Sequence, residues 1–220
     1  MSFLMRVQLP DRPGSLALLA ETLGVMNADI QSVDVIESDI AGTVTDDIVV
    51  ALPPGTLADA LITAAESVEG VLVDSIRPYA GTVDRRGQVA MLAAVADLKS
   101  DPKAALDALV TVIPKSLSAN WAIVISVDGP VLRVAASDSA PEDDGSSPQS
   151  IPVASARAID PEDEPWVPES WALLDTALAA APLAGTSMIL VLGRVGGPSF
   201  LGAEIKHLGN LGRIIGAVLA

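Results

Sequence analysis

The residues best suited to bind a small ligand form the stretch 11–16, with the sequence DRPGSL. This stretch joins a short apolar run over 3–9 to an amphipathic segment over 16–26, the pattern of a strand, a tight turn and a helix start. Pro13 fixes φ, Gly14 lets a ligand approach the backbone, and the N–H groups that open a helix have no partner inside it. The turn therefore predicts a site for a small anion.

The turn belongs to an alternation of elements over residues 1–79. Leucines recur at helical spacing after the turn, and the segments 30–36 and 43–51 mix β-branched and polar residues as half-buried strands do. A second helical pattern follows the PPG sequence at 53–55, and a last apolar run ends near Arg77. The order βαββαβ predicts an α+β, ferredoxin-like arrangement, an antiparallel sheet with both helices on one face.

Residues 1–79 resemble an ACT domain, a regulatory module that binds amino acids and controls metabolic enzymes. The resemblance rests on the 11–16 turn, the helix-to-strand junction over 23–30 and the βαββαβ order. The family commonly has Gly-Val-Asn-Ile at this junction, where this chain has Asn-Ala-Asp-Ile over 27–30. Asn27 adopts the left-handed conformation almost as readily as Gly, so we expect the turn to be kept.

The resemblance implies a ligand held between the turn of one subunit and the start of the second strand of another. The backbone N–H groups of Gly14, Ser15 and Leu16 would bind a ligand carboxylate. The carboxylates of Asp11 and Asp29 would meet its ammonium group, beside Ile30. The family often has Asn at the position of Asp29, and two facing carboxylates repel each other without a cation between them. An alternative is that this domain mediates assembly only.

The chain changes character after residue 79. Residues 80–87 contain the basic pair Arg85 and Arg86 and predict a linker. Beyond it, Asp101 and Pro102 form the start signal of a helix that leads into Pro114. The segments 121–136 and 176–194 predict two strand hairpins, and the segment between them, about 138–165, predicts a mobile acidic loop. A terminal amphipathic helix begins near residue 200. In the second hairpin, Pro182 predicts an edge strand or a bulge.

Residues 88–220 resemble a GAF domain in the order of these elements, an antiparallel sheet flanked by helices. The resemblance implies either small-molecule binding or dimerisation through the terminal helices. This chain has no Cys for attaching a tetrapyrrole and only six aromatic residues, so we expect no roomy aromatic-lined pocket and favour dimerisation. Trp121, Trp166 and Trp171 could line the loop face of this domain, but we expect them to pack in the core or in a lid over it.

Composition and motifs exclude several function classes. A net charge of −15 opposes direct binding to nucleic acid or to an anionic membrane. His207 is the only histidine and has no Cys partner, so we expect no metal site and no catalytic arrangement. The glycines of 193–199 match neither phosphate-binding loop motif, which argues against a nucleotide cofactor. Two groups of acidic residues could bind calcium loosely, but we expect solvated loops, at 142–144 and 160–164.

These observations predict a cytoplasmic, non-enzymatic regulatory protein without cofactor. It binds a free amino acid or similar metabolite through the ACT-like domain and assembles as a homodimer or higher oligomer. The cytoplasmic location follows from the absence of Cys, of a basic leader and of any apolar run long enough to span a bilayer. The first alternative is a ligand-free subunit that regulates a separate enzyme or transcription factor. An enzyme hidden in the GAF-like domain ranks third.

Overall fold

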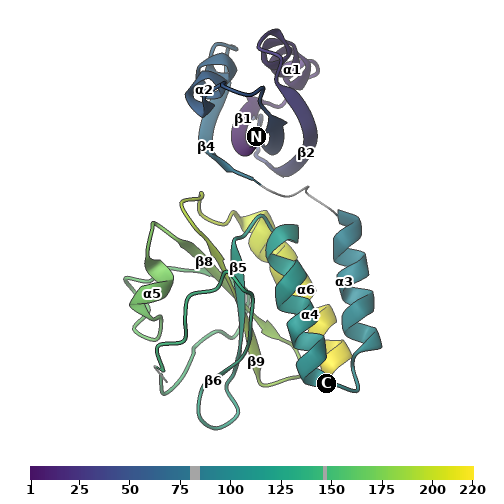
Figure 1. Ribbon diagram of the computed structural model, residues 1–220, viewed down its shortest axis with the longest axis vertical. Coiled ribbons are helices and arrows are strands. Elements are labelled where there is room, and N and C mark those ends of the chain that lie inside the picture. Colours follow the sequence, from purple (N-terminus) through teal and green to yellow (C-terminus); the bar gives the residue numbers. More distant parts are fainter. Residues whose placement is uncertain (80–84, 146–147) are drawn as a thin grey trace. The chain divides into compact units, whose positions relative to one another are not determined.

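The computed structural model describes residues 1–79, 85–145 and 148–220 of the 220-residue chain. The chain divides into two compact units, Met1–Val83 and Asp84–Ala220 (Figure 1). Each unit has its own antiparallel sheet and its own helices, so the predicted α+β class is confirmed.

The first unit is a four-stranded sheet with two helices on one face. Its elements follow in the order β1 (Ser2–Pro10), α1 (Ser15–Val25), β2 (Asp29–Ser38), β3 (Thr43–Ala51), α2 (Ala58–Glu66) and β4 (Leu72–Pro78). The strands lie in the order β2-β3-β1-β4, and every neighbouring pair is antiparallel, as the ferredoxin-like arrangement requires. Alternate residues of β1 pack against buried leucines of both helices to form the core, which includes Met5, Val7, Leu19, Leu23 and Leu61.

Helix α1 is bounded by two residues with positive φ. Gly14 precedes it with φ 96°, a conformation that a side chain would strain, and Asn27 follows it with φ 57°. The left-handed conformation that the sequence predicts for Asn27 is therefore present. These two residues direct the chain from β1 into α1 and from α1 into β2.

The second unit is a five-stranded sheet in the order β6-β5-β9-β8-β7, with every neighbouring pair antiparallel. Two of its hairpins match the predicted pair, since Gly129 and Gly185 turn with φ 81° and 83°. Its elements are α3 (Arg85–Asp97), α4 (Pro102–Ser116), β5 (Trp121–Ser126), β6 (Leu132–Ala136), β7 (Arg157–Ile159), α5 (Glu169–Ala172), β8 (Ala177–Leu183), β9 (Met188–Arg194) and α6 (Gly202–Leu219).

The two faces of this second sheet have different cores. Helices α3, α4 and α6 cover one face (Figure 1), and their leucines and valines pack on alternate residues of β5, β8 and β9. A Cβ on Gly216 would come within 2.2 Å of the Ala184 carbonyl oxygen, so this glycine allows α6 to lie directly on the sheet. The loops between β6 and β8, together with α5, cover the other face with a second cluster that contains all three tryptophans.

Four local expectations need correction. Helix α3 begins at Arg85, inside the predicted 80–87 linker, whose residues 80–84 lie outside the described part. The predicted mobile loop over 138–165 contains β7 and the buried side chains of Ile151 and Val153, because its apolar residues cover the sheet. Pro114 lies inside α4 rather than ending it. Strand β8 is internal where it pairs with β7, and Pro182 lies beyond that pairing.

Candidate functional site

The predicted turn in the first unit has the backbone of an anion site, but few free donors. Ser15 donates its backbone N–H to the Arg12 carbonyl at 3.3 Å. Within the described part of the chain, the backbone N–H groups of Gly14 and Leu16 have no acceptor. The Ser15 hydroxyl is buried and unpartnered too. The turn therefore offers two backbone N–H groups and one hydroxyl to a ligand, at the start of an 11-residue helix.

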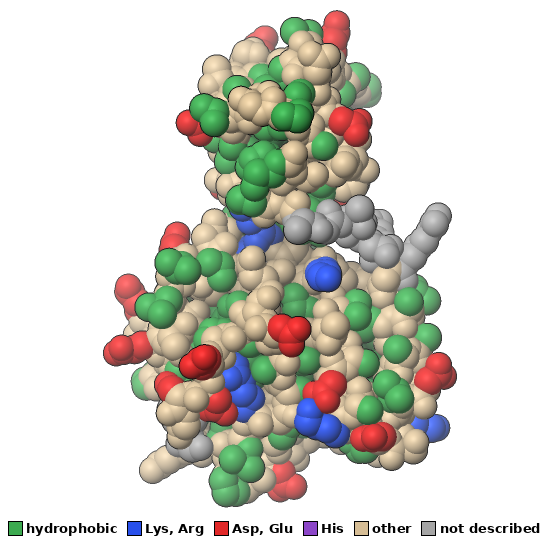
Figure 2. Space-filling model, in the orientation of Figure 1, with side chains coloured by type: hydrophobic (Ala, Val, Ile, Leu, Met, Phe, Trp, Pro, Cys, Tyr) green, Lys and Arg blue, Asp and Glu red, His purple; other side chains and the backbone are tan. Residues whose placement is uncertain are grey.

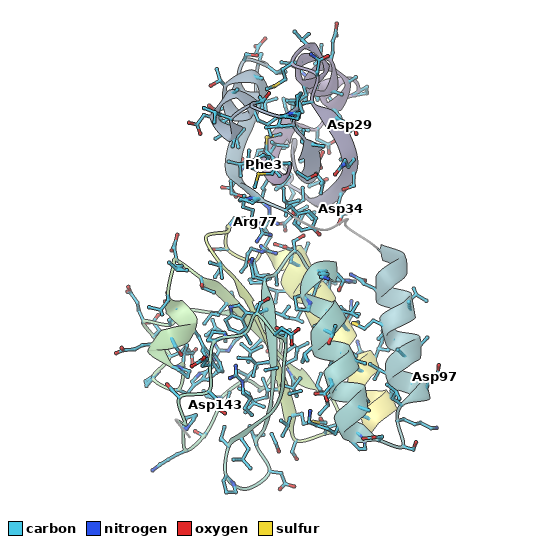
Figure 3. The ribbon with its side chains drawn as sticks, viewed as in Figure 1. Phe3, Asp29, Asp34, Arg77, Asp97 and Asp143 are labelled. Atoms are coloured by element: carbon cyan, nitrogen blue, oxygen red, sulfur yellow. The ribbon has the colours of Figure 1, made fainter. Side chains whose placement is uncertain are left out.

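The structure does not bring the two halves of the predicted ligand site together in one subunit. Strand register places Asp29 opposite Ala51, which pairs with Ser2 at the start of β1. Asp11 follows the other end of β1, so the two carboxylates lie roughly 30 Å apart along the sheet. Asp29 lies on the outer strand of this sheet, and Figure 3 shows its position. Only a second copy of the chain could place an Asp29 and its neighbour Ile30 beside this turn.

A buried carboxylate that the sequence did not single out changes the charge around the turn. Asp46 lies opposite Val7, so its side chain faces the helices, where it is 3% exposed and its Oδ1 has no partner. Burial raises the pKa of Asp46, and the carboxylates of Asp47, Asp34 and Asp11 raise it further. The neighbouring acids do not all remain unpaired, because Arg6 donates to both oxygens of Asp47 at 2.7 and 2.9 Å. The environment of Asp11 is nevertheless anionic, which opposes a ligand carboxylate.

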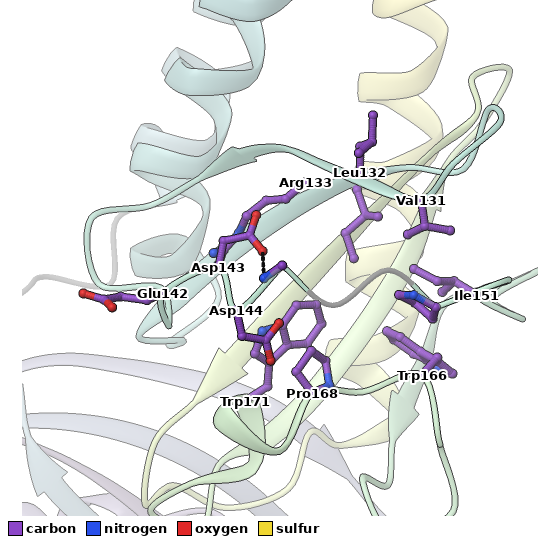
Figure 4. Close-up of a pocket in the computed structure, with 13 residues that line it drawn as sticks. Val131, Leu132, Arg133, Glu142, Asp143, Asp144, Ile151, Trp166, Pro168 and Trp171 are labelled. Carbon is purple, nitrogen blue, oxygen red and sulfur yellow. Dashed lines mark hydrogen bonds between the residues drawn. The ribbon is translucent and has the colours of Figure 1, made fainter.

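The second unit contains a cavity of about 200 Å³ on the loop-covered face of its sheet. Figure 4 shows Arg133 and Asp143 on one side, Ile151 and Trp166 on the other, and Trp171 with Pro168 between them. The Trp171 ring meets Trp166 edge-on at 6.3 Å between ring centroids. The cavity thus has an apolar, aromatic wall facing a charged one. All three tryptophans are buried in one core cluster, as expected, and Trp166 and Trp171 also line this cavity.

Arg133 supplies the positive charge of the cavity. It lies opposite Ile125 on β6, so both side chains face the loop-covered side of the sheet. Its Nη2 donates to the Pro141 carbonyl at 2.7 Å, while its Nε is buried without an acceptor. Burial lowers the pKa of Arg133, and the carboxylates of Asp143 and Asp144 oppose that shift. The guanidinium stays charged at neutral pH, and of its five N–H donors those of Nη1 are left for water or a ligand.

Three carboxylates of the loop after β6 also line the cavity, at residues 142, 143 and 144. Asp143 accepts the Gly145 backbone N–H at 3.0 Å (dashed in Figure 4), which fixes its position. Among the described residues, Arg133 forms no ion pair with them. Figure 4 shows Glu142 directed away from the other side chains, so Asp143 and Asp144 are the acids closest to the aromatic wall.

The aromatic wall is fixed by a partly buried network of hydrogen bonds. Glu164 accepts from Arg157 Nη1 and from Trp166 Nε1, each at 2.5 Å. The hydrogen bond from Arg157 lowers the pKa of Glu164, burial opposes this, and the bond from Trp166 adds to it. Since β7 begins at Arg157, this network ties the loop that carries Trp166 to the sheet.

The sequence offered one signal for this cavity that was missed. Arg133 interrupts an apolar strand between Leu132 and Val134, where a charged side chain on the sheet face demands a reason. The tryptophans stand out in the sequence, but only the fold shows that the strand, the acidic loop and the α5 region converge. Among the described residues, no group of acidic or histidine side chains could hold a metal ion, and no helix is long and apolar enough to cross a bilayer.

Two further polar side chains of the second unit, Arg194 and His207, hold its helices in place. Arg194 is fully buried and donates to the carbonyls of Leu117 and Ser118 and to Glu204 Oε1 at 2.5 Å, which joins α4 to the start of α6. His207 contacts Gln88 at 3.0 Å on the helix surface. On the face shown in Figure 2, lysines and arginines do not gather into a basic patch.

Comparison with known proteins gives likenesses to solved structures alone, because no protein-family model and no curated protein matches this sequence. The chain is similar to the GAF domain from a phosphoenolpyruvate-protein phosphotransferase from Coxiella burnetii, at 14% identity and TM-score 0.44, covering 60% of this chain and 92% of that one. It is also similar to the corresponding Acinetobacter GAF domain, at 12% identity and TM-score 0.36, with 60% and 92% covered.

A third likeness is to a formyltetrahydrofolate deformylase from Pseudomonas putida KT2440, at 9% identity and TM-score 0.29. It covers 46% of this chain, and the chain spans 39% of the deformylase's length. At these identities and TM-scores, the argument for function rests on this chain's own residues.

Proposed function

We propose that this protein is a non-enzymatic regulatory protein that senses a small metabolite, and that the metabolite binds in the cavity beside Arg133. The observation that supports this is the Arg133 guanidinium, which lines a cavity with an aromatic wall and whose Nη1 has no acceptor among the described residues. Binding sites combine an apolar lining with a few polar groups that fix orientation, and this cavity has both. The location of the protein in the cytoplasm stays a prediction.

The volume of the cavity limits the ligand. An apolar cavity of roughly 150 Å³ holds one benzene molecule, whereas pockets for drug-sized ligands measure about 300 to 1,000 Å³. The cavity here, about 200 Å³, lies near the lower of these sizes. A cyclic nucleotide or a tetrapyrrole is too large, and a molecule of one ring or one branched chain with polar ends fits.

A regulatory role fits the groups that line the cavity better than catalysis does. Among its described residues, the lining contains no His, Ser or Thr beside a base, the usual composition of a nucleophilic site. A ligand that contacts both the sheet and the loop after β6 would stabilise that loop in one arrangement. The resulting coupling to a partner surface is typically about 1 to 3 kcal/mol.

The α1 turn remains the second candidate, as an amino-acid site at the interface of an ACT-like homodimer or higher oligomer. The unpartnered hydroxyl of Ser15 and the free N–H groups at the turn favour it. It needs the second copy that would supply Asp29. If neither site binds a ligand, a subunit that regulates a separate enzyme or transcription factor is the remaining function.

The test is a thermal-shift screen of small polar metabolites on the wild-type chain and two variants. Val131→Phe adds a ring at the cavity wall, and Leu173→Phe changes a 63% exposed residue outside the cavity. We expect at least one compound to stabilise the wild type and Leu173→Phe, by about 2.7 kcal/mol at 100 times its Kd. Val131→Phe should respond at least tenfold more weakly. A screen without any shift, or an equal response by Val131→Phe, would contradict the cavity as the sensor site.

A further inference from the structure

Resting on the proposed function, we infer that the ligand of the Arg133 cavity is a small zwitterion with an apolar body, an α-amino acid of leucine or phenylalanine size. The cavity holds a guanidinium, carboxylates and an aromatic wall within one small volume. A zwitterion is the class of molecule that meets all three at once.

The guanidinium defines one end of the ligand. Arg133 Nη2 donates to the Pro141 carbonyl and Nε is buried, so the donors open to an oxygen of water or of a ligand are the Nη1 N–H groups, which have no acceptor among the described residues. Because the guanidinium is charged and forms no ion pair among the described residues, a carboxylate is the acceptor that gains most. The ligand therefore carries an anionic oxygen at this end.

The acidic loop defines the other end. Asp143 and Asp144 act on the Arg133 guanidinium electrostatically and line the same cavity. Among the described residues, the Asp143 carboxylate accepts only the Gly145 backbone N–H and is in no ion pair. A purely anionic ligand would meet this negative charge. An ammonium group offsets it and can also lie against the faces of Trp166 or Trp171. The ligand therefore carries both charges.

The body of the ligand follows from the wall and the volume. Ile125, Val131 and Ile151 join the tryptophans to give an apolar surface that cannot satisfy further polar groups. The ligand's remaining atoms must be apolar, because an unpaired buried hydroxyl or amide is costly. A branched or aromatic side chain meets this condition within about 200 Å³.

The test is isothermal titration of the full chain with matched compounds. L-leucine and L-phenylalanine carry both charges. Leucinamide has a neutral amide in place of the carboxylate, and isopentylamine has no group in its place. 4-Methylpentanoate keeps the carboxylate but lacks the ammonium group. We expect one of the two amino acids to bind at least tenfold more tightly than its singly charged analogues. Arg133→Met keeps the apolar stem and should lose at least tenfold in affinity for the amino acid, whereas Asp29→Asn in the α1-turn site should change it less than twofold.

The outcomes separate this inference from the proposed function. If 4-methylpentanoate or isopentylamine binds as tightly as L-leucine, and Val131→Phe abolishes that binding, the cavity is a sensor site but the zwitterion is wrong. If an amino acid binds equally well to Arg133→Met and loses affinity in Asp29→Asn, the α1 turn is its site and the inference fails. If none of the compounds binds, the inference fails whatever the wider screen finds.

Discussion

The α1 turn of the first unit and the Arg133 cavity of the second unit both offer hydrogen-bond donors to an anion, but residues 11–14 of the turn are exposed, whereas the cavity is lined from several sides. The turn has backbone donors at a helix start, and the carboxylate of Asp11 raises the pKa of the buried Asp46. The cavity encloses a guanidinium and faces it with tryptophans. Donor geometry alone therefore does not identify a ligand site. Enclosure and local charge decide whether a ligand's interactions with the site are more favourable than its interactions with water.

The first and largest test of this comparison is Glu164→Gln, which removes the carboxylate that holds Trp166 in the cavity wall. Removing the charge that Arg157 and Trp166 donate to should lower the free energy of unfolding of the second unit by roughly 1.5 to 3 kcal/mol. All three tryptophans lie in that unit, so tryptophan fluorescence during urea unfolding measures it selectively. The exposed Glu162→Gln in the same loop is the matched control and should leave stability unchanged.

The same network gives a pH dependence with a defined sign. The folded pKa of Glu164 lies below its ordinary value of 4.5, so its contribution is complete above pH 4.5 and is lost as pH falls through the folded pKa. The difference in unfolding free energy between wild type and Glu164→Gln should therefore shrink in acid. A difference in unfolding free energy that stays constant from pH 7 to pH 3 would exclude this network as its source. A shift of one pKa unit corresponds to roughly 1.4 kcal/mol.

The second test acts on the turn. Gly14→Ala places a side chain at φ 96°, which should destabilise the first unit by about 1 to 2 kcal/mol. Hydrogen exchange of the β1 and β3 amides measures this unit separately. Affinity in the cavity should not change, and a matched Gly24→Ala, inside α1 with open space for a Cβ, should not destabilise. Loss of ligand affinity in Gly14→Ala alone would move the binding site to the turn.

The third test removes the buried charge near the turn. Asp46→Asn should stabilise the first unit by about 1 kcal/mol at neutral pH, because a buried charge without full pairing is costly. The raised pKa of Asp46 means that wild-type stability falls as pH rises from 3.8 through that pKa, so the gain should disappear below pH 3.8. Exposed Asp74→Asn is the control, and hydrogen exchange of β3 the measurement. A destabilised Asp46→Asn would show that this carboxylate has a favourable partner.

The smallest effect is expected from Asp29→Asn on the isolated chain at low concentration. Asp29 is exposed at the start of an outer strand, so stability should change by less than about 0.5 kcal/mol. Sedimentation velocity across a concentration series then tests the ACT-like assembly. A dimer that weakens or tightens in Asp29→Asn places this residue at an interface, and an unchanged dimer removes it from one.

The sequence predicted most of the helices and strands, because each of those had a local cause. The Asp101 side chain accepts the Ala104 N–H as an N-cap, and Gly129 and Gly185 turn the hairpins as their positions suggested. The candidate site in the cavity could not be predicted in this way, since Arg133, Asp143 and Trp171 come from a strand, a loop and a short helix that only the fold brings together. Asp46 was missed for the same reason, because its burial depends on β3 facing the helices.

The most direct test of the central claim is an ¹H–¹⁵N correlation spectrum of the full chain titrated with L-leucine and L-phenylalanine. The indole N–H signals report on the second unit, since all three tryptophans lie there, and the Gly14 amide reports on the turn. We predict that the indole signals of Trp166 and Trp171 shift with saturation, while the Gly14 amide signal stays in place. Saturable shifts at Gly14 and Ser15 with unmoved indole signals would contradict the cavity and favour the turn.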